Sequence, residues 1–330
     1  MEYKIVTHNG TFHPDDVFAV ATLELAFGDA EIIRTRDSEK IKTGDFIVDV
    51  GGKNDGEKNF DHHQEGGAGE RPNGVPYASF GLVWKKYGKT IIHEVLNSPF
   101  FKGSTRSGRD FKSSALETSA PPLVKEELNT TDLIFNLVDK TLVEPLDLSD
   151  NGKGELKPLF GDVYPNTLFH IIYSQNPTWK EKDADRDKIF SETVQLAKKI
   201  LLRQIKVATD EIEGALKVEE AYQNAPDKRI IILDDNYPWI ETLSKYSEPL
   251  FAIEPSKDKT AWEVESVKTN PNAFQIRKAF PKDWAGKRDE ELQKISGVSD
   301  AIFCHNGLFF AVAKSKEGAV SLAKLAINSS

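Results

Sequence analysis

The first fifty residues contain three apolar runs of strand length, which are YKIVTH (3–8), EIIRTR (31–36) and DFIVDV (45–50). Pro14 opens an apolar helix between the first two runs, and the helical pattern stops near Gly28. A further helix is predicted over YASFGLVWKKYG (77–88). This order of strand, helix, strand, strand and helix is typical of an α/β sheet, whose ligands gather at the carboxyl ends of the strands. His8 and Asp49 both stand at such ends.

A long amphipathic helix is predicted beyond Pro177, because apolar residues recur at steps of three and four. They are Phe190, Val194, Ala197, Leu201, Ile205, Ala208, Ile212 and Leu216. A second α/β segment follows from RIIILDD (229–235) and ends in the helix of EGAVSLAKLAI (317–327). The chain exceeds the usual length of roughly 100 to 200 residues for one domain. We therefore expect an α/β protein with two domains: residues 1–185 with a largely parallel sheet, and residues 186–330, where the long helix leads into a second α/β domain.

Residues 98–131 are rich in Ser, Thr, Gly, Lys and Pro, and we interpret this polar stretch as a mobile insertion rather than a domain boundary. Its basic half could touch a polyanion, although such a stretch is more often simply solvated; the basic residues are Lys102, Arg106, Arg109 and Lys112. The following run, TDLIFNLVDKTLVEPLDLSDNG (131–152), predicts a helix that ends at Gly152.

The composition narrows the class of protein. With 39% hydrophobic and 29% charged residues, it is that of an ordinary globular protein, and no apolar run reaches the eighteen residues of a membrane span. The N-terminus, MEYKIVTHNG, has no signal or transit pattern, which predicts a cytoplasmic protein. A single cysteine, Cys304, excludes an intrachain disulfide and a cysteine-based zinc cluster. The net charge of −9 argues against general coating of nucleic acid, but leaves open a local basic groove or a bound cation.

Histidine is concentrated at the start of the chain. Of seven histidines, four lie in the first sixty-three residues: His8, His13, His62 and His63. They fall in or beside THNGTFHPDD (7–16), VDVGG (48–52) and FDHHQ (60–64). A carboxylate at the end of an apolar strand is costly unless it is paired or binds metal. Mixed imidazole and carboxylate ligands suit Mn²⁺, Zn²⁺ or Fe²⁺ better than Ca²⁺, and two such cations can activate water for phosphoester hydrolysis.

Each of these residues also has a plain structural interpretation. His8 alone could be a buried structural histidine, and His62 with His63 could be a surface pair. Asp15 or Asp16 could simply favour a helix N-terminus, which attracts acidic side chains. Taken together, in a chain otherwise poor in histidine, the three segments favour a metal centre. The other two histidines of the first 170 residues, His93 and His170, have no comparable neighbours and are expected to be structural.

With these motifs the sequence resembles the DHH phosphoesterase superfamily, named for the triplet at Asp61 to His63. More narrowly it resembles the Myg family of DHH-like exonucleases. The narrower resemblance covers most of the chain and rests on NPTW (176–179), YPW (237–239), FQIR (274–277), FPKDW (280–284), AGKRDEEL (285–292) and FCHNGLFFAVAKSKEGA (303–319). The polar insertion is longer than the family pattern, and LFFAVA stands where the family has a glycine-rich end.

The resemblance implies a DHH-type catalytic domain with a dinuclear site, commonly Mn²⁺, followed by a C-terminal substrate-binding domain. The implied ligands are His8, His13, Asp15, Asp49 as the bridge, His62 and Asp150. Asp147, one turn upstream, is a rival for the last position. His63 would contact the scissile phosphate. Mg²⁺, Zn²⁺ or Co²⁺ could replace Mn²⁺.

The resulting hypothesis is a phosphodiesterase that removes terminal nucleotides from single-stranded RNA or DNA. His63, and Arg277 or His305 from the second domain, would steady the charge on the phosphate oxygens. Arg277 could equally serve in an ion pair. Four tryptophans could stack on bases or belong to the core: Trp179, Trp239, Trp262 and Trp284. The alternatives are a small-molecule phosphoesterase or pyrophosphatase, and a noncatalytic binding protein that metal stabilises.

Overall fold

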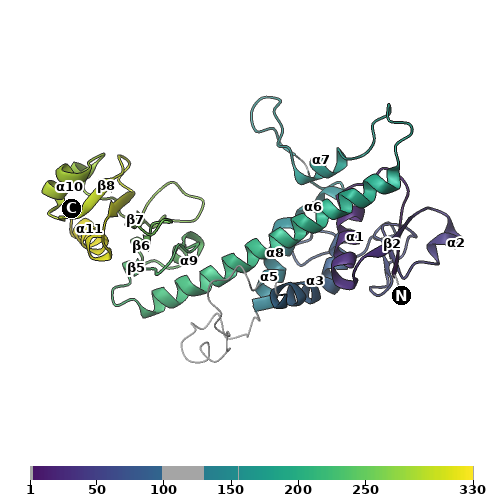
Figure 1. The fold of residues 1–330 in the computed structure, drawn as a ribbon, viewed down its shortest axis with the longest axis horizontal. Coiled ribbons are helices and arrows are strands. Elements are labelled where there is room, and N and C mark those ends of the chain that lie inside the picture. The colour runs from purple at the N-terminus through teal and green to yellow at the C-terminus, as the bar shows by residue number, and fades with distance from the viewer. Residues whose placement is uncertain (1–2, 99–129, 155, 330) are drawn as a thin grey trace. The chain divides into compact units, whose positions relative to one another are not determined.

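The structure of this protein is a computed structural model that describes residues 3–98, 130–154 and 156–329. The chain divides into two compact units, Met1–Thr209 and Asp210–Ser330. Helix α8 (Arg186–Asn224) contributes residues to both units (Figure 1). The predicted functional division at residue 185 therefore stays a prediction. Most of the predicted insertion, including the four basic residues of its basic half, lies outside the described residues.

The first unit is built on a parallel sheet, which confirms the predicted fold class. Its strands are β1 (Tyr3–Thr7), β2 (Ala30–Arg34), β3 (Phe46–Val48) and β4 (Asn59–Phe60). Their order across the sheet is β2-β1-β3-β4, and all three neighbouring pairs are parallel. Ile5 lies opposite both Ile32 and Phe46, so the central strand β1 is bonded on both sides. The carboxyl ends of the four strands consequently share one edge of the sheet.

The described part of the first unit contains several helices before α8. They are α1 (Pro14–Phe27), α2 (Ser38–Ile41), α3 (Ser79–Asn97), α5 (Thr130–Val138), α6 (Glu144–Asp150) and α7 (Leu168–Tyr173). Helix α1 begins at Pro14 as predicted, and its residues are buried without a break as far as Glu24. A helix that is apolar on every side belongs in the interior. Helix α1 packs against α3, so the first turns of both helices are fixed next to the sheet.

One π-helical turn (Asp139–Val143) separates α5 from α6, where the sequence predicts a single helix through Gly152. Helix α6 ends at Asp150. The wide turn is a local insertion in the helical ladder, of a kind that often occurs at functional sites. Because α6 follows this turn directly, the turn determines where Asp147 and Asp150 of α6 point.

Helix α8 confirms the predicted apolar stripe over its first part, where Phe190, Val194, Ala197, Leu201, Ile205 and Ala208 are buried. Ile212 and Leu216 are only partly buried. In the second unit the buried positions are instead Gly214, Val218 and Tyr222, and the last two pack with the core formed around Trp239. The buried face therefore shifts around the helix between the two units.

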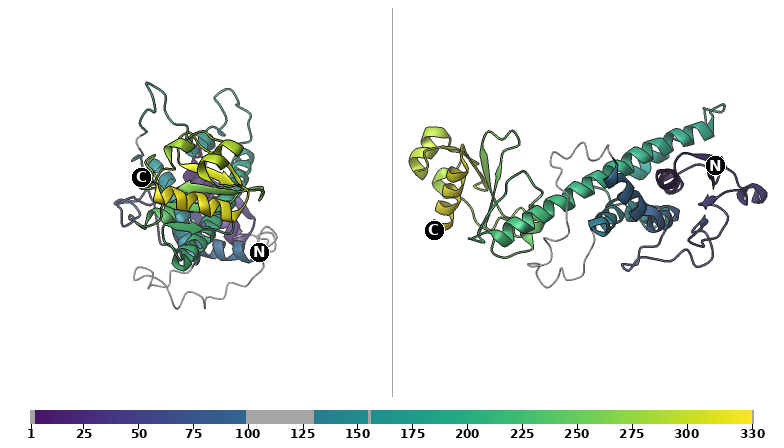
Figure 2. Two further views of the ribbon diagram at one scale, coloured as in Figure 1. Left: turned by 90° about the vertical axis from the view of Figure 1, so that its left-hand side faces the viewer. Right: turned by 60° about the horizontal axis from the view of Figure 1, so that its bottom comes forward.

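The second unit carries a mixed sheet of five strands, β5 (Ile230–Ile232), β6 (Phe251–Pro255), β7 (Trp262–Ser266), β8 (Ala301–Cys304) and β9 (Phe310–Ala313). The strand order across the sheet is β5-β6-β7-β9-β8. The pair β5 and β6 is parallel, and the other three neighbouring pairs are antiparallel. The helices are α9 (Ile240–Ser244), a 3₁₀ turn (Lys282–Trp284), α10 (Asp289–Ser296) and α11 (Lys316–Asn328). Figure 2 shows α10 and α11 beside the sheet in two further views. Of the described helices, none is long and apolar enough for a membrane span.

Candidate metal centre

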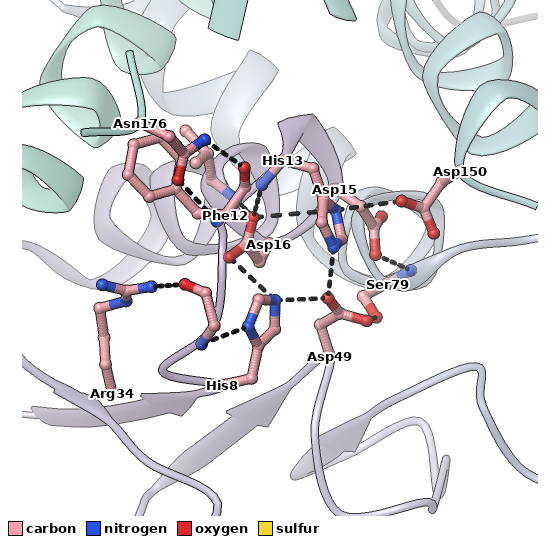
Figure 3. A network of polar contacts seen from close by, with 12 residues as sticks. His8, Phe12, His13, Asp15, Asp16, Arg34, Asp49, Ser79, Asp150 and Asn176 are labelled. Atoms are coloured by element: carbon pink, nitrogen blue, oxygen red, sulfur yellow. Dashed lines mark hydrogen bonds and ion pairs between the residues drawn. The ribbon is translucent and has the colours of Figure 1, made fainter. Parts of the chain in front are cut away.

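The strands of the first sheet end at residues of the candidate centre. His8 directly follows β1, Asp49 follows β3, and His62 comes two residues after β4. Because these strands are parallel, the three side chains meet at the same edge. The N-cap of α1 adds His13 and the end of α6 adds Asp150, and Figure 3 shows these two side chains pointing toward Asp49. His62 joins the same cluster, because its Nε2 lies 3.0 Å from Asp150 Oδ2.

Asp49 lies at the middle of this cluster. Its Oδ2 is 3.2 Å from His8 Nε2 and 3.6 Å from His13 Nε2, and its Oδ1 is 3.5 Å from His62 Nε2. The backbone of Asp49 has a φ of 55°, a left-handed conformation that is uncommon for a residue other than glycine. Strained backbone of this kind is concentrated at functional sites. The turn after β3 thus holds one carboxylate between three imidazoles.

Asp150 joins the cluster from the other side, whereas Asp147 does not. The Asp150 oxygens lie 3.0 Å from His13 Nδ1 and 3.0 Å from His62 Nε2. Asp147 instead accepts hydrogen bonds from Arg71 Nη1 at 2.7 Å and from the Gly81 N–H at 3.0 Å. The contacts therefore favour Asp150 over Asp147 as the last ligand, although that assignment stays a prediction.

Asp15 faces both the centre and the start of α3. Its two oxygens accept hydrogen bonds from the N–H groups of Ser79 at 3.0 Å and Phe80 at 2.6 Å, which are the first residues of that helix. A carboxylate at a helix N-terminus satisfies orphan amides and is favoured by the helix dipole. Asp15 Oδ2 is also 3.8 Å from His62 Nε2, so α3 holds this carboxylate at the centre.

Asp16 is a site residue that the sequence analysis did not place among the ligands. It is fully buried, and its Oδ1 accepts hydrogen bonds from the N–H groups of His13 and Val17, both at 2.9 Å. Its Oδ2 lies 3.2 Å from His8 Nε2. The adjacent aspartates of HPDD were a signal for a helix start, but the sequence could not tell which of them caps α1 and which reaches α3.

The pKa values in the cluster follow from burial opposed by close opposite charges. Burial alone lowers the pKa of His13, but the Asp150 carboxylate and the charges of Asp16 and Asp49 outweigh it and raise that pKa to about 10. In the same way burial lowers the pKa of His62, while Asp150 and Asp49 raise it to about 11. The two imidazoles are therefore protonated at neutral pH when only protons compete for the site.

The carboxylates divide into two kinds. Burial raises the pKa of Asp16 to about 6 and that of Asp15 well above its ordinary value. Burial also acts to raise the pKa values of Asp49 and Asp150, but the neighbouring imidazoles outweigh it and lower both. The cluster thus favours positive charge, and a metal cation that entered it would compete with protons for the same atoms.

Several buried polar atoms of the cluster lie close to an ionisable neighbour but make no hydrogen bond of normal geometry, namely His8 Nε2, His13 Nδ1, Asp16 Oδ2, Asp49 Oδ2 and His62 Nε2. Buried polar atoms without partners are rare, and metal ligation is one explanation for them. Within the described ranges, three groups have ligand atoms within 4.8 Å of one another: His8, His13 and Asp49; Asp49, His62 and His63; and Asp15, His62 and Asp150. Asp49 and His62 each belong to two groups. This donor set fits divalent cations that accept nitrogen and oxygen ligands.

His63 lies at the rim of the centre, and its side chain is 60% exposed. Its Nδ1 is 2.8 Å from Asp61 Oδ1 and 3.4 Å from Asp49 Oδ1, while Asp61 Oδ2 accepts a hydrogen bond from the Gly52 N–H. Asp61, the first residue of the DHH triplet, therefore orients the ring, and Nε2 is the nitrogen left for another partner.

The two candidate phosphate contacts of the second unit have different surroundings. The Arg277 guanidinium donates hydrogen bonds to the carbonyls of Pro249 and Ser244, both at 3.1 Å. His305 accepts a hydrogen bond from the Gly307 N–H at 2.9 Å through Nδ1, and its ring lies 4.5 Å from that of Phe309. Their catalytic role stays a prediction, and Arg277 already has a structural one.

Among the four candidate stacking tryptophans, Trp239 and Trp284 are buried in the cores of the second unit. Trp262 is partly buried beside the same core as Trp284. Trp179 differs from these three, because it is 80% exposed. Trp179 is therefore the most accessible of the four, although the Lys180 ammonium lies 5.3 Å from the centre of its ring.

The fold and the cluster together define an α/β protein with a His–Asp centre at the carboxyl edge of a parallel sheet. The MYG1 exonuclease family model, described as "Uncharacterised protein family (UPF0160)", matches residues 4–327. This chain therefore belongs to that family, as the resemblance predicts.

Relatives match over nearly the whole chain. A MYG1 protein of Schizosaccharomyces pombe is 31% identical over 343 residues, which are 98% of this chain and 97% of the relative. A MYG1 protein of Saccharomyces cerevisiae is 31% identical over 351 residues, with coverage of 99% and 96%. The MYG1 exonuclease of Homo sapiens is 30% identical over 346 residues, with coverage of 97% and 85%.

Proposed function

We propose that this protein is a metal-dependent phosphodiesterase that releases nucleotides from the ends of single-stranded RNA or DNA. The observation that carries the proposal is the convergence of three His–Asp ligand groups around Asp49 and His62. The name of the human relative, MYG1 exonuclease, supports the nucleic-acid substrate. The six residues that we assign as metal ligands are His8, His13, Asp15, Asp49, His62 and Asp150.

Two divalent cations, with Mn²⁺ as our choice, would supply an activated water and would neutralise charge on the phosphoester during an in-line displacement. Asp49, which approaches three imidazoles, is the proposed bridging ligand. Asp16 holds the loop in place by capping α1 next to His8.

His63 is the proposed phosphate contact from the first unit. Asp61 holds Nδ1 inward, so Nε2 can donate a hydrogen bond to a phosphate oxygen that becomes more negative during the reaction. In the second unit, we assign the predicted phosphate contact to His305 in preference to Arg277, because the Arg277 guanidinium already donates to two backbone carbonyls.

The experiment uses a single-stranded oligonucleotide labelled at one end, with metal-free protein and added Mn²⁺. The proposal predicts progressive shortening from one end that stops in Asp49→Asn. Asp162→Asn replaces an exposed carboxylate elsewhere in the first unit and should leave the activity unchanged. Both variants should be checked for retained fold by circular dichroism. Mn²⁺-loaded protein that leaves every oligonucleotide whole would refute the substrate class.

A small phosphoester is the second candidate substrate. The net charge of −9 favours it, because a small substrate needs no extended basic groove. Turnover of pyrophosphate, a dinucleotide and a longer oligomer under the same conditions separates the two candidates. A noncatalytic, metal-stabilised protein would bind the cations and hydrolyse none of them.

A further inference from the structure

Arg36 lies just beyond the carboxyl end of β2, at the same edge of the sheet as His8 and Asp49. Its Nη2 is 3.8 Å from the point where Gly10 would carry a Cβ, and that point is 3.3 Å from His8 Nδ1. A side chain at position 10 would touch both groups, so the Arg36 guanidinium and the Nδ1 side of the His8 imidazole both lie close to Gly10. His8 Nδ1 accepts a hydrogen bond from the Gly10 N–H at 3.2 Å, while His8 Nε2 faces Asp16 and Asp49. The positive group therefore lies on the outer side of the His8 ring, one imidazole away from the candidate metal centre.

Arg34, two residues earlier, shows what an arginine with a structural role looks like at this place. Its side chain is 1% exposed and donates to the Gly10 carbonyl at 2.6 Å and to Asp187 Oδ1 at 3.3 Å. Its guanidinium also lies 4.7 Å from the centre of the Phe190 ring. Arg34 thus fixes the loop between His8 and α1, as Figure 3 shows.

Arg36, in contrast, is exposed, and within the described part of the chain its side chain has no hydrogen bond or ion pair. The neighbouring carboxylate of Asp37 is turned toward α2, where it accepts hydrogen bonds from the N–H groups of Glu39 at 2.9 Å and Lys40 at 3.1 Å. An arginine without a protein partner keeps all five donors of its planar fork available, and that fork matches the geometry of a phosphate group.

We propose that Arg36 is a phosphate-binding residue, which holds a phosphate group of the substrate next to the metal centre through charge-assisted hydrogen bonds. The proposal rests on the proposed function for the nature of the substrate. It adds a residue that belongs neither to the ligand set nor to the predicted phosphate contacts.

The test compares the binding of 5′-AMP and adenosine to Mn²⁺-loaded protein by isothermal titration calorimetry. The variants are Arg36→Gln, Arg36→Lys and the matched control Arg203→Gln. Arg203 is exposed and, among the described residues, also has no partner, but it lies about 25 Å along α8 from the start of that helix. Mn²⁺ affinity is measured on each variant to show that the metal centre is unchanged.

We expect Arg36→Gln to weaken AMP binding by about tenfold or more, which is the usual effect of removing a charge-assisted hydrogen bond. Arg36→Lys should keep part of the affinity, because it retains charge without the fork. Adenosine binding and Mn²⁺ affinity should not change, and Arg203→Gln should behave as wild type. Equal AMP affinity in Arg36→Gln and wild type, an equal loss in Arg203→Gln, or no AMP binding by the wild type would overturn the proposal.

The two proposals fail in different ways. If oligonucleotides are shortened but AMP binding does not depend on Arg36, the proposed function stands and the role of Arg36 is wrong. If AMP binding depends on Arg36 but no oligonucleotide is shortened, the phosphate site stands and the exonuclease assignment is wrong.

Discussion

Replacing Arg71 by methionine should strongly destabilise the first unit. The Arg71 side chain is only 4% exposed, and it donates to Asp147 at 2.7 Å and to both oxygens of Asp139 at 2.8 and 2.9 Å. Its guanidinium also lies over the Tyr77 ring at 4.4 Å. Arg71 therefore ties the loop after the DHH triplet to the π-helical turn and to α6. Methionine keeps much of the apolar contact but leaves two carboxylates without their cation.

The expected size of the effect follows from the burial of Asp147, which is complete. Removing one partner of a buried ion pair costs about 3–5 kcal/mol. For a unit of the size of Met1–Thr209, each kcal/mol shifts the melting temperature by about 2–4 °C, which gives a decrease on the order of 6–20 °C.

The pH dependence of this loss provides a further check. Burial raises the pKa of Asp147 to about 7, and Arg71 opposes that rise. Without Arg71 the pKa of Asp147 should rise further. At lower pH Asp147 then takes up a proton, and the buried carboxylate no longer carries an unpaired charge. The destabilisation should therefore be smaller at pH 5.5 than at pH 8.

The assay is thermal unfolding by circular dichroism at both pH values, with Arg203→Met as the control for loss of an exposed arginine. Arg203→Met should stay within about 0.5 kcal/mol of wild type. A melting temperature in Arg71→Met within 2 °C of the control at pH 8 would refute the reasoning.

Three further predictions concern the same unit. In metal-free protein the free energy of unfolding should fall as the pH rises from about 5 to about 8. In the folded protein the pKa values of Asp16 and Asp147 are raised to about 6 and about 7, whereas in the unfolded chain an aspartate has a pKa of about 4. The folded state therefore holds more protons at low pH, and this stabilisation is lost as the pH rises. Urea unfolding in the presence of a chelator across this pH range measures the trend, and an increase in the free energy of unfolding would contradict the prediction. Gly81→Ala should lower the melting temperature despite the better helix propensity of alanine, because the new methyl group would overlap the Asp147 carboxylate. An unchanged melting temperature would show that the Asp147 side chain can move aside without loss of stability. Asn176→Ala removes hydrogen bonds to the N–H and the carbonyl of Phe12, at 3.0 and 2.8 Å, and should lower the free energy of unfolding by about 1–3 kcal/mol. It should also weaken Mn²⁺ binding, because His13 is next to Phe12 in the same loop. Wild-type Mn²⁺ affinity in a calorimetric titration of this variant would show that the loop contact does not affect the centre.

Much of the first unit is predictable because its local patterns agree with its tertiary structure. The apolar runs at 3–8, 31–36 and 45–50 pair as parallel strands, and parallel strands bring their carboxyl ends to one edge. For this reason side chains as distant in sequence as His8 and Asp49 could be expected to meet. The buried stripe of α8 is predictable in the same way as far as Ala208.

The remaining details depend on contacts between elements that no local pattern records. Asp15 and Asp16 are adjacent and chemically identical, yet one caps α3 and the other caps α1, because the packing of those helices decides which way each points. Asp147 and Asp150 differ through Arg71, whose position in a long loop could not be inferred. The π-helical turn that orients α6 likewise has no clear signal in the sequence.

The most direct test of the central claim is a count of tightly bound Mn²⁺ ions by calorimetric titration of metal-free protein. Wild-type protein should bind two ions per chain, and Asp49→Asn should lose tight binding of at least one of them, because the Asp49 carboxylate belongs to two of the three ligand groups. A wild-type chain that binds no Mn²⁺ tightly, or an Asp49→Asn variant that still binds two ions with wild-type affinity, would contradict the account.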